Sequence, residues 1–183
     1  MKKQFLTPNE WSRPQRPLDE VRAIAMHWVE NPGTSAQFNW DWFELRKDGQ
    51  HGYGSAHFII DPIETIWCMP LDEMAYHVGP VEKATPWAKQ ELDPYANSFC
   101  IGIELCHPTS AGHFAEGTLC QAADLCAVLC AKFYLDPLSE IIRHYDVTAK
   151  HCPKYWVDYP EKMETFKMRV VDIMSMKIQL GSD

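Results

Sequence analysis

The sequence predicts a single domain of the α/β class, with α+β as the alternative, in which helices flank a central mixed β-sheet. Short apolar stretches with strand character alternate along the chain with longer segments whose apolar residues recur at helical spacing. The chain has 183 residues, the length of one domain with a substantial hydrophobic core. No internal repeat or low-complexity linker divides it, so residues 1–183 are expected to form one domain.

Strand character appears in five segments. The expected strands are residues 22–29, 56–60, 65–69, 99–106 and 141–145. The second and third flank a turn and predict a hairpin. In residues 99–106, Ile101 and Ile103 alternate with Gly102 and Glu104, which puts Glu104 on the face opposite the apolar residues.

Three helices are expected. The first spans residues 36–47, the second lies between Thr118 and Asp136, and the third starts near Pro160. Each of the first two follows a capping-box pattern, a Thr with a Gln three residues later, at Thr34 and at Thr118. Residues 1–20 are Pro-rich and predict an extended N-terminal arm, and residues 79–98 predict a long polar loop.

The composition argues against two classes of function. The formal net charge is −8 and no run of Lys and Arg interrupts it, so the chain lacks the basic surface of a nucleic-acid-binding protein. No apolar stretch reaches the length of a membrane span, and no apolar signal-peptide core follows the first lysines. The seven Cys lack the spacing of a disulfide framework. We therefore expect a protein made in the reducing cytoplasm.

Two histidines and a cysteine are candidate metal ligands. His144 ends an expected strand, and Cys152 follows eight residues later with a proline directly after it. His27, at the end of an earlier strand, could supply a third ligand, which is the number that catalytic zinc sites use. A single His at a strand end is more often packed or exposed than metal-bound, so the spacing alone leaves that alternative open. Cys126 and Cys130 lie on the apolar face of a helix and are expected to pack in the core.

Four short blocks extend this pattern over residues 22 to about 155. The blocks are Ala25-Met26-His27-Trp28 with Asn31-Pro32-Gly33, His57-Phe58-Ile59-Ile60, Ala75-Tyr76-His77-Val78-Gly79-Pro80 with Ile101-Gly102-Ile103-Glu104, and Arg143-His144-Tyr145-Asp146 with Lys150-His151-Cys152-Pro153. In this order they resemble the zinc-dependent N-acetylmuramoyl-L-alanine amidases, a family that includes bacteriophage lysozyme-amidases and animal peptidoglycan recognition proteins.

This resemblance implies a single amidase catalytic domain with the fold of the peptidoglycan recognition proteins. It implies that His27, His144 and Cys152 bind Zn²⁺. It also implies that Glu104 and Lys150 flank the metal as catalytic groups. The alternation in residues 99–106 agrees, because it allows Glu104 to face a cleft while its apolar neighbours face the core.

One position departs from the pattern of many family members. They carry a Tyr just before the His-Phe pair, where this chain has Ala56. In those members the Tyr assists catalysis, and in the phage endolysin branch a Glu is the corresponding group. The chain therefore resembles that branch, and Glu104 is the expected base, with Asp146 as the next candidate. His77 and Trp28 are expected to contact the substrate, and His107 is expected at the surface.

The activity that the resemblance implies is hydrolysis of the amide between the lactyl group of N-acetylmuramic acid and the L-alanine of the stem peptide. The alternative is a module that binds peptidoglycan without cutting it, as relatives that lack the Cys ligand do. Cys152 and Glu104 are present, which favours the enzyme; a regulatory partner of another protein has no feature that supports it. We expect a monomer that acts on the cell wall after release or export, as an endolysin or autolysin does.

Overall fold

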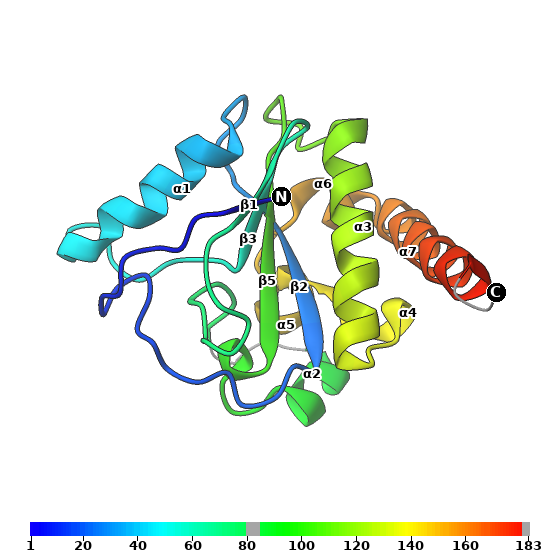
Figure 1. The fold of residues 1–183 in the computed structure, drawn as a ribbon, viewed down its shortest axis with the longest axis horizontal. Coiled ribbons are helices and arrows are strands. Elements are labelled where there is room, and N and C mark those ends of the chain that lie inside the picture. Colours follow the sequence, from blue (N-terminus) through cyan, green and yellow to red (C-terminus); the bar gives the residue numbers. More distant parts are fainter. Residues whose placement is uncertain (80–84, 181–183) are drawn as a thin grey trace.

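A six-stranded mixed β-sheet forms the centre of the computed structural model, which describes residues 1–79 and 85–180 (Figure 1). The strands are β1 (Lys2–Lys3), β2 (Ala23–Trp28), β3 (Phe58–Ile60), β4 (Thr65–Trp67), β5 (Cys100–Leu105) and β6 (Ile141–Arg143). Their order across the sheet is β1-β4-β3-β5-β2-β6; β3 and β4 pair antiparallel and the other neighbours pair parallel. The predicted mixed sheet and hairpin are confirmed, and β1 is an edge strand that the sequence analysis missed.

Helices cover both faces of this sheet. They are α1 (Ala36–Leu45), α2 (Pro86–Glu91), α3 (Glu116–Phe133), α4 (Pro137–Glu140), α5 (His144–Thr148), α6 (Lys154–Asp158) and α7 (Pro160–Leu180), with 3-10 helices at Arg46–Asp48 and Ala96–Ser98. The long helices α3 and α7 pack against each other on one side, while α1 contacts β3 and β4 and lies at the other end of the molecule (Figure 1). The predicted fold class, a sheet flanked by helices, is therefore confirmed.

Side-chain alternation along the two central strands divides the sheet into two unlike faces. On β2, Ile24 and Met26 join the core cluster that includes residues of α3 and α7. Ala23, Ala25 and His27 leave the strand on the opposite face because successive side chains alternate. The parallel neighbour β5 repeats the pattern, so the face opposite α3 is lined with small and polar residues.

Helix α1 begins at Ala36 as predicted and ends at Leu45, whereas its cap residue and the start of α3 differ from the prediction. The N-cap of α1 is Ser35, whose hydroxyl accepts a hydrogen bond from the Phe38 backbone N–H at 3.1 Å, and the Thr34 hydroxyl donates to the preceding turn instead. Helix α3 begins two residues before the predicted cap, because Thr118 is fully buried and packs inside the first turn. Thr34 and Ser35 both carry a hydroxyl that can cap, so tertiary contacts decide between them. The N-cap of α3 is Ala115, which makes no side-chain capping hydrogen bond.

Two further expectations need correction. The segment 79–98 contains α2 and a 3-10 helix rather than a loop alone, with Thr85 capping α2 through a hydrogen bond from the Ala88 N–H at 3.3 Å; residues 80–84 lie outside the described part. The strand expected at 141–145 ends at Arg143. There the Asp146 carboxylate accepts the Arg143 backbone N–H at 2.8 Å, which starts helix α5 at His144.

The N-terminal arm is fixed along the sheet rather than loose. Strand β1 pairs with β4, and Leu6 is buried. The Arg13 guanidinium donates to both carboxylate oxygens of Glu73, each at 2.7 Å. Within the described residues, no helix combines the length and the apolarity that crossing a membrane requires.

Candidate metal centre

The three candidate metal ligands come from neighbouring ends of the sheet. His27 lies near the end of β2, and His144 follows β6 directly. Because β2 and β6 are parallel neighbours with Met26 opposite Arg143, the residues that follow this pair emerge side by side. Cys152 lies in the turn between α5 and α6 and returns to the same point. The topology therefore brings together three residues that are far apart in the sequence.

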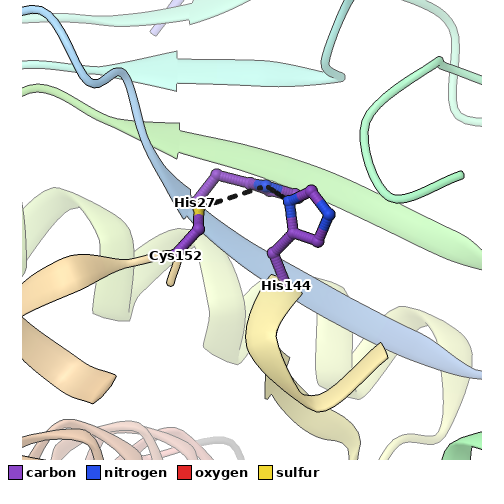
Figure 2. Close-up of side chains that lie close together, drawn as sticks. All are labelled: His27, His144 and Cys152. Carbon is purple, nitrogen blue, oxygen red and sulfur yellow. Dashed lines mark hydrogen bonds between the residues drawn. The ribbon is translucent and has the colours of Figure 1, made fainter. Parts of the chain in front are cut away.

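The donor atoms of these residues converge (Figure 2). One ligand atom from each of His27, His144 and Cys152 lies within 4.8 Å of the others. The His144 and His27 Nδ1 atoms are 3.1 Å apart, and Cys152 Sγ lies 3.8 Å from His27 Nδ1. The three side chains are buried. Two imidazole nitrogens and one thiol form a set that could hold a metal ion, and we call these residues the ligand triad.

The hydrogen bonds behind His27 fix which of its nitrogens is available. His77 Nε2 lies 3.2 Å from the Cys100 carbonyl oxygen, which can only accept, so His77 Nε2 carries the proton. His77 Nδ1 is then an acceptor, and the His27 Nε2–H group donates a hydrogen bond to it at 3.0 Å. This leaves His27 Nδ1 with its lone pair directed to the triad. Metal-binding histidines are commonly held in this way, usually by a carboxylate or carbonyl rather than a second imidazole.

Room for the His77 ring comes from Gly102 on β5. A Cβ atom at that position would lie 2.6 Å from His77 Cγ, closer than real contacts allow. The Gly102 N–H donates to His57 Nδ1 at 3.0 Å, and His57 Nε2 donates to the Glu73 carbonyl at 2.9 Å. This group of imidazoles, which meet edge to face, was not predicted from the sequence. The glycine in the middle of an apolar strand was its one visible signal.

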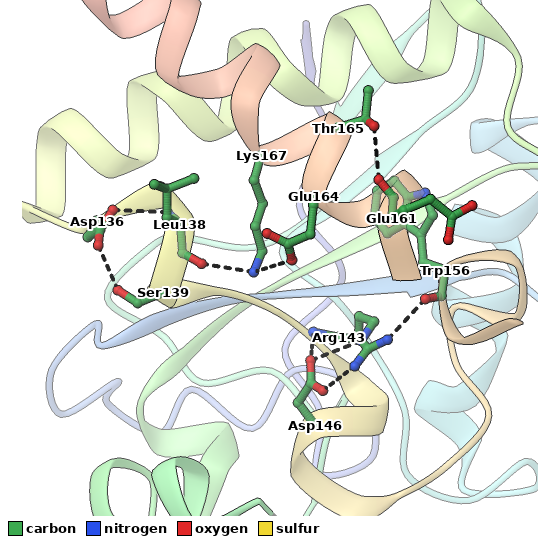
Figure 3. A network of polar contacts seen from close by, with 10 residues as sticks. All are labelled: Asp136, Leu138, Ser139, Arg143, Asp146, Trp156, Glu161, Glu164, Thr165 and Lys167. Carbon is green, nitrogen blue, oxygen red and sulfur yellow. Dashed lines mark hydrogen bonds and ion pairs between the residues drawn. The ribbon is translucent and has the colours of Figure 1, made fainter. Parts of the chain in front are cut away.

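An ion pair fixes the segment that carries the other two ligands (Figure 3). The Arg143 guanidinium donates to Asp146 at 2.7 and 3.1 Å and to the Trp156 carbonyl at 3.0 Å. It thereby joins the start of α5 to α6, the two helices that flank Cys152. Both carboxylate oxygens of Asp146 are bonded to Arg143, so Asp146 is a poor candidate for the catalytic base. Its pairing raises the pKa of Arg143.

Burial sets the protonation of the triad. It lowers the pKa of His27 well below its usual value, with a further contribution from His144, and lowers the pKa of His144 to about 4. Both rings are therefore neutral at pH 7, which is the form that binds metals. Burial also raises the pKa of the Cys152 thiol to about 12. A cation between the three atoms would act against this shift, because it stabilises the thiolate.

Glu104 and Lys150 lie beside the triad. Glu104 is directly opposite His27 in the β2–β5 register, and its Oε2 atom is shielded from solvent without a hydrogen-bond partner in the described part of the chain. Burial raises the pKa of Glu104 to about 8, an effect that the nearby Lys150 charge opposes. Lys150 Nζ lies 3.5 Å from Glu30 Oε2, and its side chain is 54% exposed. The arrangement offers a desolvated carboxylate and an exposed cation near the ligand triad.

A cavity of about 470 Å³ adjoins the triad. Its described walls are Arg16, Tyr53, Tyr76, His77, Val78, Gly79, Tyr95, Asn97 and His144. His77 thus both contacts His27 and borders the cavity, and its expected contact with substrate stays a prediction. The volume lies in the range of small-ligand pockets.

Trp28 has a different environment from His77. It points to the face of β2 opposite His27, and its ring stacks on His107 with centroids 4.6 Å apart. It is not among the described residues that line the cavity, so its contact with substrate also stays a prediction. The expectation that His107 lies at the surface is wrong: the residue is 2% exposed, because it packs against Trp28.

Comparison with known proteins identifies relatives along most of the chain. A family model described as N-acetylmuramoyl-L-alanine amidase matches residues 17–155, which include the whole triad. The chain is 35% identical over 178 residues to the N-acetylmuramoyl-L-alanine amidase BlyA of Bacillus subtilis (strain 168), covering 94% of this chain and 47% of BlyA. It is 32% identical over 180 residues to the N-acetylmuramoyl-L-alanine amidase CwlL of Bacillus licheniformis, covering 96% and 48%. The chain spans about half the length of these curated relatives.

Solved structures share the fold. The catalytic domain of XlyA superposes with a TM-score of 0.70 at 21% identity and covers 92% of this chain and 97% of that one. The structure of PlyL gives a TM-score of 0.73 at 17% identity, with coverage of 93% and 96%. At these identities the likeness shows the fold alone, and it agrees with the fold expected from the sequence.

Proposed function

This chain belongs to the N-acetylmuramoyl-L-alanine amidase family, and we propose that it is a zinc-dependent peptidoglycan hydrolase. The bond cleaved is the amide between the lactyl group of N-acetylmuramic acid and the L-alanine of the stem peptide. The observation that carries this proposal is the convergence of His27, His144 and Cys152 within 4.8 Å, inside the span that matches the family. Because the substrate is a cell-wall polymer, we infer action at the wall after release or export.

The donor set supports zinc as the metal. Two neutral imidazoles and a thiol, contributed by three protein residues, match the ligand types and number of catalytic zinc sites. The His77 contact holds the His27 ring so that Nδ1 is the coordinating atom. When bound, zinc would supply the Lewis acidity that polarises the scissile carbonyl and activates water.

Glu104 is the proposed general base. Its Oε2 atom has no other hydrogen-bond partner among the described residues, and its strand position faces His27. Oε2 would take a proton from the attacking water as the new C–O bond forms. It would then deliver that proton to the alanine nitrogen as the C–N bond breaks. A desolvated carboxyl group is suited to both steps, because its pKa lies nearer to neutrality than that of an exposed glutamate.

Lys150 is proposed to stabilise the negative charge that develops on the carbonyl oxygen. It lies two residues before Cys152, and the Cys152 N–H donates to the Lys150 carbonyl at 2.7 Å, which anchors its backbone to the triad. The ammonium group is paired only loosely with Glu30 and is half exposed, so it can reorient toward a bound substrate.

A single incubation tests this function. The protein is mixed with a defined muropeptide, with and without a zinc chelator, and products are separated by mass spectrometry. We expect a stem peptide with a new free amine on L-alanine, formed only without the chelator. The Cys152→Ser variant is the matched control and should release none. If the wild-type protein retains the muropeptide but leaves it uncut, the chain is a binding module and the proposal is wrong.

A further inference from the structure

The cavity beside the triad carries a charge opposite to that of the whole protein. The chain has a formal net charge of −8, yet the described walls of the cavity contain the cationic Arg16 and no carboxylate side chain. The Tyr76 and Tyr95 hydroxyls also border it, and neither hydroxyl bonds to another described residue. The Tyr53 hydroxyl is already engaged with Glu10 at 3.1 Å. The cavity is therefore suited to a ligand that carries negative charge or many acceptor atoms.

Asn97 presents a donor whose orientation is fixed. Its Oδ1 atom accepts the backbone N–H groups of His77 at 3.0 Å and Val78 at 2.9 Å. The side-chain amide cannot flip without losing both bonds, so Nδ2 is the atom that remains available as a donor to the cavity. The side chain is 1% exposed, and Nδ2 donates to no other described residue. Nδ2 is not among the described atoms sealed from solvent without a partner, so this donor is open to the cavity and can bond to a ligand or to water.

Arg16 lines the cavity with an exposed guanidinium, unpaired within the described residues, on a backbone that the fold fixes. Its carbonyl accepts the Met74 N–H at 2.8 Å, and the nearby ion pair between Arg13 and Glu73 secures the arm that carries it. Other arginines, such as Arg13, Arg22, Arg143 and Arg169, each pair with a carboxylate of the chain. The Arg16 guanidinium pairs with none in the described part. The side chain is exposed at the cavity and no described carboxylate neutralises it, so its charge is available to a substrate.

We propose that Arg16, assisted by Asn97, binds a carboxylate of the stem-peptide residue that follows L-alanine. This inference rests on the proposed function, which puts the scissile bond at the triad. His144 is one of the residues that line the cavity, so the cavity adjoins the proposed position of the cut amide. The residue after L-alanine lies about 3.5 Å further along an extended chain and can therefore reach it. Arg16 is then a specificity-determining residue: it selects acidic stems over amidated ones through a charge-assisted hydrogen bond.

Two matched compounds test the inference: N-acetylmuramoyl-L-alanyl-D-glutamate and the same compound with both glutamate carboxyls converted to amides. Binding is measured by calorimetry on chelated protein, where turnover is blocked, and cleavage is measured on zinc-loaded protein. We expect the wild type to prefer the acid by roughly 10- to 100-fold, the usual effect of one charged hydrogen bond. Arg16→Gln should lose that preference and bind the diamide as the wild type does.

Arg22→Gln is the control, because it removes another arginine outside the cavity and should keep the preference. Asn97 is left intact, since its Oδ1 bonds support the backbone at His77. Equal affinity of the wild type for both compounds, or an acid preference that persists in Arg16→Gln, overturns the inference. Because the calorimetry is independent of turnover, it decides this point even if neither compound is cleaved, a result that would count against the proposed function alone.

Discussion

The two faces of strands β2 and β5 differ in the size of their side chains. The face under α3 carries branched or long apolar residues, including Ile24, Met26 and Ile103, all of them fully buried. The opposite face carries Ala25 and Gly102 at the same level, followed by His27 and Glu104 at the strand ends. The same two strands thus hold a closely packed core on one side and leave space for imidazole rings on the other.

This difference shows how the sheet separates stability from chemistry. Branched residues under α3 remove apolar area from water, which stabilises the fold. Small residues on the other face contribute less burial, but they admit His77 and His57 and so determine how His27 is held. Substitutions on the two faces should therefore have different consequences, one for folding and the other for metal binding and catalysis.

The largest effect is expected from Glu104→Gln, on the face with the histidines. The change keeps the shape of the side chain and removes the proposed proton acceptor, so kcat should fall by about 10²–10⁴-fold. Zinc content and melting temperature should stay at wild-type levels. If the variant cleaves muropeptide at nearly the parent rate, another residue must be the base. Asp146 is an unfavourable alternative, because its carboxylate is already bonded to Arg143.

Ile103→Ala changes the neighbouring residue on the opposite face. It removes a fully buried side chain from the core under α3, so the free energy of unfolding should fall by about 2–5 kcal/mol. The kcat and zinc affinity of the protein that remains folded should be unchanged. Urea denaturation and kinetics below the unfolding range would check both, and a large loss of zinc affinity would contradict the separation of the two faces.

Gly102→Ala should affect the histidine face with a smaller loss of stability. The new methyl group would collide with His77, displace the ring and release His27 Nε2 from its partner. Loss of such a supporting contact weakens metal binding by about 10- to 100-fold. Zinc affinity is measured by competition with a coloured chelator, with Ile103→Ala as the matched control from the same strand. Unchanged affinity would show that His77 is dispensable for orienting His27.

The smallest effect concerns pH. Burial lowers the pKa of His57 from 6.5 to about 4, so between these values the unfolded chain binds a proton that the folded chain does not. His57 therefore makes stability fall as the pH drops through this window, by at most about 1.4 kcal/mol per pH unit. In metal-free protein, His57→Gln should have a shallower decline from pH 7 to pH 5 than the wild type in urea denaturation. Parallel curves would mean that His57 does not contribute.

The sequence was sufficient to predict the alternation of the central strands, because a period of two is a local property that the residues of β2 and β5 display directly. It also predicted the residue types of the triad. It did not predict the contact between His27 and His77, which lie fifty positions apart and meet only because Gly102 leaves space. The start of α1 at Ala36 was predicted correctly, but its cap was assigned to Thr34 instead of Ser35, because both adjacent residues can cap and packing makes that choice.

The most direct test of the account is a zinc titration of metal-free protein with muropeptide cleavage as the readout. If His27, His144 and Cys152 form one catalytic site, activity should rise with added zinc and reach a plateau at about one equivalent per chain. His144→Ala should bind much less zinc under the same conditions and stay inactive. Full cleavage by the metal-free protein, or unchanged zinc occupancy in His144→Ala, would contradict the account.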